Sequence, residues 1–232
     1  MLNTIHKVKD ISFTLQRKAR LKHTYIEIRA KEVLVKTNMR TSLEEIEELV
    51  SRKSAWILKH LKKNETLKPK KKIENGTEVY FLGLPYEIKL QEHKELKQRR
   101  VVVEHSKIVF YVLEGLSEEE LQWHLDMFYK AHAIEKIDFI LKKWSRNMKL
   151  EPTYVGYRKA KTRWGSCSSK NRISFNYYLM KLPLNVVEYV VVHELAHIEH
   201  KNHSKNFWSL VGFYLPHYKK LIEELRKLEK EI

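Results

Sequence analysis

The most constraining stretch of this chain reads His-Glu-Leu-Ala-His at residues 193–197. Two histidines four positions apart lie on one face of an α-helix, about one turn from each other, so both imidazoles can reach a single metal ion. Glu194 follows the first histidine, where its carboxylate can reach a water on that ion without being a ligand. The apolar run at residues 186–192 predicts that this helix is largely buried.

A chain rich in histidine and acids can carry this pattern by accident, and this one has 12 His and 29 Asp or Glu. In that alternative, His193 and His197 are hydrogen-bonded core histidines and Glu194 is a solvated helix residue. The apolar helical context and a further histidine at residue 203 favour the metal site.

His203 is the third ligand that we favour, because zinc prefers imidazole and a close ligand needs no long-range assembly. A continuous helix would carry His203 to another face, so the chain must turn after His200. In the pattern H-E-x-x-H-x-x-G-x-x-H a glycine occupies the turn, and here that position is His200. We therefore expect a strained residue or a differently shaped turn. His200 itself and a carboxylate from the last helix, Glu223 or Glu224, remain alternative ligands.

Three protein ligands leave one position for water, whose pKa zinc brings down towards about 7. We expect Glu194 to take a proton from that metal-bound water and to pass it to a leaving amine, which is peptide-bond hydrolysis. Zinc deaminases use Cys ligands from a C-x-x-C motif, and this chain has a single Cys.

Composition limits the other classes. The single Cys excludes an internal disulfide and suits a reducing compartment, and no stretch approaches the about 20 apolar residues that cross a bilayer. We expect a cytoplasmic protein with a protein or peptide substrate and no membrane partner. The net charge of +16, densest at residues 59–72, keeps open an alternative of another class, in which DNA or RNA binds a basic surface and the zinc is structural.

The first half of the chain alternates as strands do. Residues 11–15, 25–30 and 33–37 predict strands, the last two as a hairpin, and Ser42 predicts the start of a helix that continues to about residue 61. Residues 78–90 predict two short strands around a glycine turn, and residues 101–103 and 107–112 extend that sheet. No internal repeat stands out.

A long helix is expected from Ser117 to a point before Pro152. We place the domain boundary just before it, near Gly115, which gives a β-rich N-terminal region at residues 1–115 and a catalytic domain at residues 116–232. In the second region we expect strands at residues 153–157 and 172–180, a turn-rich stretch at residues 161–169, and the motif helix after Pro183.

Three stretches together resemble a known family. They are Arg-Trp-Gly-Ser-Cys-Ser at residues 163–168, Ile-Ser-Phe-Asn at residues 173–176, and residues 193–208 with Asn-His-Ser and Phe-Trp after the motif. This combination resembles the YgjP-like zinc metallopeptidase family, which is related to the SprT-like and WLM zincin peptidases.

The resemblance implies an α+β fold: a zincin-like catalytic domain, with a small mixed sheet and an active-site helix, preceded by a small β-rich N-terminal region. It also implies that His193, His197 and His203 hold Zn²⁺ and that Glu194 is the catalytic acid and base. Because SprT-like relatives include proteases that act on proteins crosslinked to DNA, a protease of DNA-bound proteins is a further alternative.

Zincin folds pair a substrate with an edge strand before the metal helix, and residues 173–178 are the expected edge strand. Arg163 is a candidate to stabilise an oxyanion or a nearby carboxylate. Cys167 has no recognisable base beside it in the sequence, so we expect it to lie in a tight turn and not to be a nucleophile. Tyrosines 157, 177 and 178 are candidate oxyanion donors that the sequence does not rank.

Overall fold

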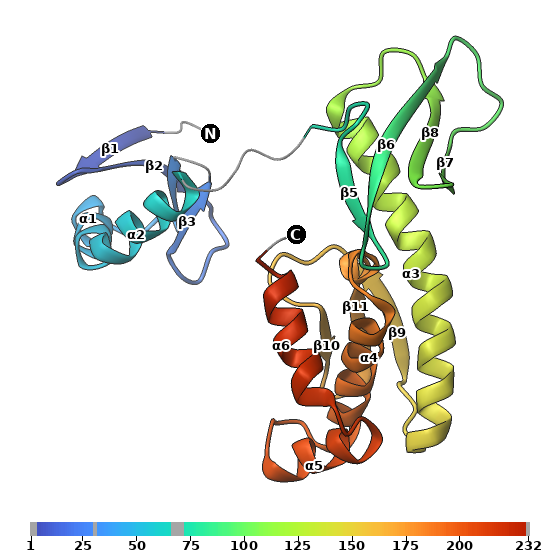
Figure 1. Ribbon diagram of the computed structural model, residues 1–232. Coiled ribbons are helices and arrows are strands. Elements are labelled where there is room, and N and C mark those ends of the chain that lie inside the picture. Colours follow the sequence, from blue (N-terminus) through green and yellow to red (C-terminus); the bar gives the residue numbers. More distant parts are fainter. Residues whose placement is uncertain (1–3, 30–31, 66–71, 231–232) are drawn as a thin grey trace. The chain divides into compact units, whose positions relative to one another are not determined.

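The computed structural model describes residues 4–29, 32–65 and 72–230. The chain forms two compact units, Met1–Lys71 and Lys72–Ile232 (Figure 1). This division differs from the boundary near Gly115 that the sequence suggested. The sheet that precedes Gly115 shares its buried cluster with the long helix that follows it, so the two belong to one unit. Lysines 68, 70 and 71, which supported the nucleic-acid alternative, lie outside the described residues.

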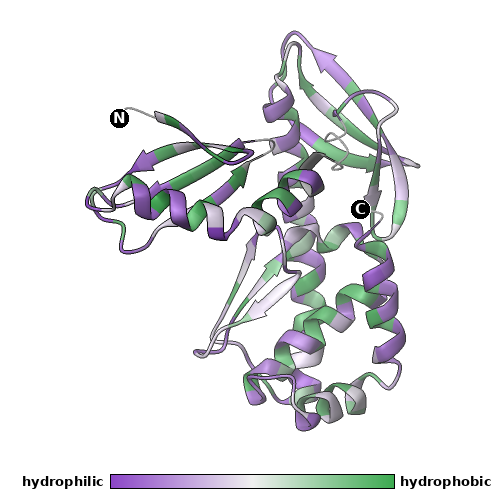
Figure 2. Cartoon of the chain, turned by 90° about the vertical axis from the view of Figure 1, so that its left-hand side faces the viewer, coloured by the Kyte–Doolittle hydropathy of each residue, from purple (hydrophilic) through white to green (hydrophobic). Residues whose placement is uncertain are grey.

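The first unit has one four-stranded sheet in the order β1-β2-β4-β3. Its strands are β1 (Thr4–Val8), β2 (Ile11–Arg17), β3 (Tyr25–Arg29) and β4 (Glu32–Thr37). β2 and β4 are parallel, and the two outer pairs are antiparallel. Hydrophobic and hydrophilic residues alternate along these strands, which buries one face of the sheet (Figure 2). The expected hairpin of β3 and β4 is confirmed, and β1 was not predicted.

Helices α1 (Leu43–Arg52) and α2 (Ser54–Glu65) follow the sheet. Ser42 caps α1 as expected: its hydroxyl accepts from the Glu45 N–H, and the Glu45 carboxylate accepts from the Ser42 N–H. The single helix predicted to residue 61 is interrupted at Lys53, which closes α1. The sheet and α1–α2 enclose a small core, made of Ile11, Phe13, Leu15, Val33, Val35, Ile46, Val50 and Ile57.

The second unit begins with a four-stranded sheet in the order β5-β6-β8-β7. Its strands are β5 (Glu78–Phe81), β6 (Leu84–His93), β7 (Arg100–Glu104) and β8 (Lys107–Leu113). The glycine turn between β5 and β6 is confirmed, with Gly83 at φ +83°. Helix α3 (Glu118–Met148) then packs on this sheet, and its N-cap Ser117 forms the same reciprocal pair with Glu120.

The two four-stranded sheets repeat one topology. Phe13 pairs with Val33 in the first sheet and Ile88 with Ile108 in the second, so the second pair lies 75 positions after the first. The pairs Tyr25–Lys36 and Arg100–Tyr111 keep the same offset, and so do the caps at residues 42 and 117. The expectation of no internal repeat is therefore corrected: the repeat lies in strand order and register, and few side chains are identical.

The rest of the second unit holds a three-stranded sheet and the helices around it. Its elements are β9 (Tyr154–Arg158), β10 (Gly165–Cys167), β11 (Arg172–Asn176), the 3₁₀ helix η1 (Tyr177–Lys181), α4 (Leu184–Glu199), α5 (Lys205–Tyr214) and α6 (Tyr218–Leu228). The sheet order is β10-β11-β9, with β11 antiparallel to β10 and parallel to β9. The expected α+β class, with a small mixed sheet beside the motif helix, is confirmed.

Three expectations for this sheet are corrected. The turn-rich stretch contains a strand, β10. The strand expected to reach residue 180 ends at Asn176, whose side chain accepts from the Tyr178 N–H and starts the 3₁₀ helix. β11 is the central strand and not an edge strand, because β10 and β9 pair with both of its sides. None of the described helices combines the length and the apolar character that crossing a membrane requires.

Candidate metal centre

The three predicted histidines come together at the end of α4. His193 and His197 lie on that helix, which ends at Glu199, and His203 lies in the connection to α5. One nitrogen from each ring can be chosen so that all three lie within 4.8 Å of one another. The turn contains no left-handed residue: His200 has φ −117° and ψ 101°. The turn is thus of a different shape from the glycine turn, and His200 is not strained there.

The donor set fits zinc. Zinc–nitrogen bonds of about 2.0–2.1 Å in a tetrahedron place ligand nitrogens about 3.3 Å apart, and the Nε2 atoms of His193 and His203 are 3.1 Å apart. Burial lowers the pKa of His193 to about 3, and the neighbouring His197 and His203 add to the effect. His193 is therefore neutral near pH 7, which is the form that binds a metal.

Two groups behind the histidines orient their rings. The Nδ1 of His197 lies 3.0 Å from the carbonyl oxygen of His200, so this nitrogen donates and leaves Nε2 free for a metal. The Tyr189 hydroxyl lies 3.3 Å from Nδ1 of His193. A hydrogen-bond partner on the ring nitrogen away from the metal fixes the tautomer and the direction of a metal-binding imidazole. Tyr189 was not predicted, although its position four residues before His193 places it on the same helical face.

An aromatic wall supports the cluster from α5. Phe207 is fully buried, and its ring centroid lies 5.0, 4.6 and 4.9 Å from those of His193, His197 and His203. Trp208 stacks on His203 at 5.6 Å. Both aromatic residues therefore belong to the hydrophobic core or pack against it, and they hold the histidine rings in position. Ser204 starts α5 by accepting from the Phe207 N–H, which sets the direction of that helix.

Glu194 lies on the buried side of α4, against β10. Its side chain is 5 % exposed, and its Oε2 has no hydrogen-bond partner among the described residues. A Cβ added at Gly165 would lie 2.5 Å from Oε1 of Glu194, so a glycine is needed at this point of β10. Burial raises the pKa of Glu194 to about 8, and the positive charge of Arg163 opposes that rise. A divalent cation near the carboxylate would favour its charged form and lower the pKa.

The alternative ligands lie outside the histidine cluster. The Nε2 of His200 is 3.8 Å from the Glu199 carboxylate, and Glu224 accepts a hydrogen bond from the Asn185 side chain at 3.2 Å. Cys167 faces α4 from β10, and burial raises the pKa of its thiol, which does not suit a nucleophile.

The candidate oxyanion tyrosines are engaged elsewhere. Tyr157 donates to Asp138 of α3 at 2.5 Å, and Tyr178 donates to Asp126 of α3 at 2.6 Å. Tyr177 also donates to Asp126, at 3.2 Å. Because these hydroxyl protons are given to carboxylates of α3, the tyrosines stabilise the fold.

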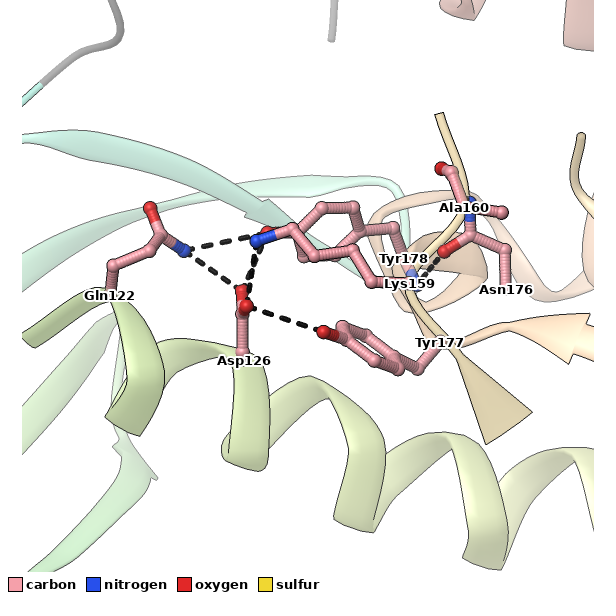
Figure 3. Close-up of polar contacts among 7 residues, drawn as sticks. All are labelled: Gln122, Asp126, Lys159, Ala160, Asn176, Tyr177 and Tyr178. Atoms are coloured by element: carbon pink, nitrogen blue, oxygen red, sulfur yellow. Dashed lines mark hydrogen bonds and ion pairs between the residues drawn. The ribbon is translucent and has the colours of Figure 1, made fainter. Parts of the chain in front are cut away.

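Asp126 is the centre of a polar cluster that holds the loop before β10 (Figure 3). Besides the two tyrosines, it accepts from Gln122 at 2.9 Å and from Lys159 at 2.6 Å. The buried Asn176 side chain donates to the carbonyl oxygens of Ala160 at 2.9 Å and of Arg163 at 3.2 Å. These bonds tie both ends of the loop at residues 159–163 to the scaffold, and this loop leads into the strand that contacts Glu194. This cluster has no local pattern in the sequence, because its members lie far apart along the chain.

Comparison with known proteins bears on this site. The model of the YgjP-like metallopeptidase domain matches residues 22–228. The chain belongs to this family. It is therefore a metallopeptidase, as the resemblance in the sequence implied. The family match begins at residue 22 and ends at residue 228, so it includes most of the first unit as well as the second.

Solved structures and curated proteins add less. The metallopeptidase zymogen abylysin of Pyrococcus abyssi is 21 % identical, with a TM-score of 0.37, and covers 39 % of this chain and 92 % of its own. The metallopeptidase zymogen jannalysin of Methanocaldococcus jannaschii is 22 % identical, with a TM-score of 0.36. The match covers 41 % of this chain and 97 % of jannalysin. No curated protein matches the chain.

Proposed function

We propose that this protein is a zinc metallopeptidase in which His193, His197 and His203 bind the ion and Glu194 moves the proton. The observation that carries the proposal is the pairing of two features at one end of α4. Three imidazole nitrogens converge there, and one residue from the first of them lies a buried carboxylate whose Oε2 has no hydrogen-bond partner among the described residues. A structural zinc site has no need of such a carboxylate, whereas a hydrolytic site needs a base.

When bound, zinc supplies a Lewis acid that brings the pKa of a coordinated water towards about 7 and polarises the substrate carbonyl. The chain's own residues supply the rest. Oε2 of Glu194 takes the proton from the attacking water and returns it to the leaving amine. Gly165 and the loop before it hold this carboxylate in place, while Tyr189 and the His200 carbonyl hold two of the ligands.

A peptide is the substrate that the surroundings favour. β10 pairs with β11 on one side, and its other side has no partner strand among the described residues. A free strand edge offers backbone donors and acceptors to an extended peptide. Because β10 also contacts Glu194 through Gly165, a peptide added to this edge would pass beside the proposed base.

The deciding experiment is Glu194→Gln, which keeps the shape of the side chain and removes its basicity. We expect the variant to retain one zinc per chain and to lose about 10²–10⁴-fold in kcat on an unfolded protein substrate. Glu199→Gln, on the same helix but exposed, is the matched control and should keep wild-type kcat. Equal activity of Glu194→Gln and the wild type would refute the role of Glu194.

A second experiment identifies the third ligand. Zinc content is measured by elemental analysis of purified His203→Ala, His200→Ala and Glu224→Ala. We expect only His203→Ala to lose zinc at near-stoichiometric metal. Loss of zinc in either of the other two, with His203→Ala unaffected, would assign the ligand differently.

A further inference from the structure

We propose that this site selects acidic stretches of polypeptide, through cations placed around β10. The inference rests on the proposed function, since it concerns which peptides that site takes. It starts from the positions of three basic side chains relative to a strand of three residues.

One basic side chain lies before β10 in the sequence, a second contacts its middle residue, and a third lies just past its end. Arg163 lies two positions before the strand, and its charge acts on Glu194. Arg158 of β9 reaches across the sheet, and its Nη2 donates to the hydroxyl of Ser166, the middle residue of β10, at 3.2 Å. Lys201, from the turn after α4, donates to the carbonyl oxygen of Ser168 at 3.3 Å, just past the end of the strand. All three side chains are exposed.

Arg158 and Arg163 belong to a basic segment. From residue 151 to residue 172 the chain has six Lys or Arg and one acid, Glu151. Lys159 is paired with Asp126. Within the described part of the chain, the other five and Lys201 have no carboxylate oxygen within 4.0 Å. All six side chains are exposed, and no neighbouring carboxylate of the described residues neutralises their charge.

The acids near the site are buried or contact other groups. Glu194 is buried against Gly165, and Glu229 accepts from the indole N–H of Trp164 at 2.6 Å. Glu199 lies 3.8 Å from His200. A ligand along β10 thus meets an excess of positive charge at both ends and on the outer face of the strand.

The geometry favours an acidic peptide over a nucleic acid. An added strand projects alternate side chains to the two faces of the sheet, so carboxylates on one face of a substrate would meet Arg158 while its backbone pairs with β10. Single-stranded nucleic acid binds through bases stacked on open aromatic rings. One face of the exposed Tyr154 ring on this sheet is occupied by the guanidinium of Arg172, 4.3 Å from the ring centroid.

The test compares three quenched-fluorescence peptides with one cleavable centre and flanks of Glu, Gln or Lys. With the zinc-loaded full chain, kcat/KM should fall in the order Glu, Gln, Lys. Each exposed charge pair is expected to contribute about 1.5-fold to fivefold at low salt. The differences should shrink near 1 M salt, where the screening length is about 3 Å.

Reversing the charge of two side chains tests whether they cause the preference for the acidic peptide. Arg158→Glu with Lys201→Glu should reverse the preference towards the Lys peptide, and the milder Arg158→Gln guards against a folding defect in the double variant. Lys142→Glu, exposed on α3 beyond the opposite edge of the sheet, matches one charge change and should leave the order unchanged.

The outcomes separate the two proposals. If no peptide is cleaved by zinc-loaded protein, the proposed function fails. If all three peptides are cleaved equally at low salt, the function stands and the acidic preference is overturned. A labelled single-stranded oligonucleotide is tested by fluorescence anisotropy against the same variants. Binding that Arg158→Glu with Lys201→Glu abolishes, without any peptide preference, would assign the surface to nucleic acid and overturn the inference.

Discussion

Gly165→Ala is the sharpest test of how β10 controls the site, because it adds one methyl group at a measured place. The new Cβ would lie 2.5 Å from Oε1, 2.6 Å from Cγ and 2.8 Å from Cδ of Glu194. Gly165 does not have a left-handed φ, so alanine adds no backbone strain. The whole effect must come from the contact with Glu194.

The magnitude follows from that overlap. Carbon atoms in contact lie about 3.5–4.0 Å apart, so Glu194 or β10 must move by about 1 Å. Overpacking a buried contact of this kind costs about 1–3 kcal/mol of unfolding free energy. A 1 Å misplacement of a reacting group costs about 10²-fold in rate. We expect a modest loss of stability together with a large loss of kcat.

The assay measures kcat, zinc content and the urea midpoint of the same preparations. The zinc ligands are not on β10, so zinc content should stay at one per chain while kcat falls. Gly156→Ala on β9 is the matched control: its Cβ would meet only the ring of Tyr154, at 3.0 Å, and that exposed ring can swing away. Wild-type kcat in Gly165→Ala, with unchanged stability, would refute the idea that this contact holds Glu194.

Three further predictions concern the groups behind the site. Tyr189→Phe removes the hydroxyl beside His193 and should weaken zinc binding about 10- to 100-fold in competition with a chromophoric chelator, whereas unchanged affinity would remove Tyr189 from the site. Asn176→Asp replaces two donated hydrogen bonds by a carboxylate facing carbonyl oxygens, and should lower the unfolding free energy by about 2–4 kcal/mol in urea titrations. A variant as stable as the wild type would show that these two bonds do not hold the loop at residues 159–163. Burial raises the pKa of Asp126, but hydrogen bonds from Lys159 and its other donors outweigh this and leave the pKa below its ordinary value, so its contribution is present above pH about 4 and is lost below. The urea midpoint of Asp126→Asn should therefore fall less between pH 7 and pH 3 than that of the wild type. An equal fall in both proteins would contradict the idea that the ionised Asp126 stabilises the fold.

Local signals in the sequence predicted much of the scaffold. The reciprocal caps at Ser42 and Ser117 were found because a serine and a glutamate three residues later satisfy each other's backbone groups. The motif helix was predicted because histidines four residues apart lie on the same face of an α-helix. The shape of the turn at His200 was left open, since an extended conformation and a left-handed one both reverse the chain and the residue type does not separate them.

The domain boundary was missed for a different reason. A change from strands to a helix near Gly115 resembles a boundary when only the sequence is considered. The structure shows the same change twice, after β4 and after β8, as the end of a repeated unit of four strands and a helix. In the second copy the helix continues to Met148 and joins the sheet to the rest of the unit. Hydrophobic periodicity identifies each element but carries no information on which elements share a core.

The interpretation of the site depends on the strand order β10-β11-β9. The alternation at residues 172–176 shows which side chains of β11 are buried, and Ile173 and Phe175 are indeed fully buried. Alternation is the same for a central strand and an edge strand, because both bury one face, so it could not show that β10 lies outside β11. β10 is only three residues long and carries Gly, Ser and Cys, which predict a turn. Those small residues are what the position requires, since Gly165 must admit the side chain of Glu194. The small residues of β10 therefore have two consequences. They made its sequence resemble a turn, and they allow the free edge of the sheet to lie next to Glu194.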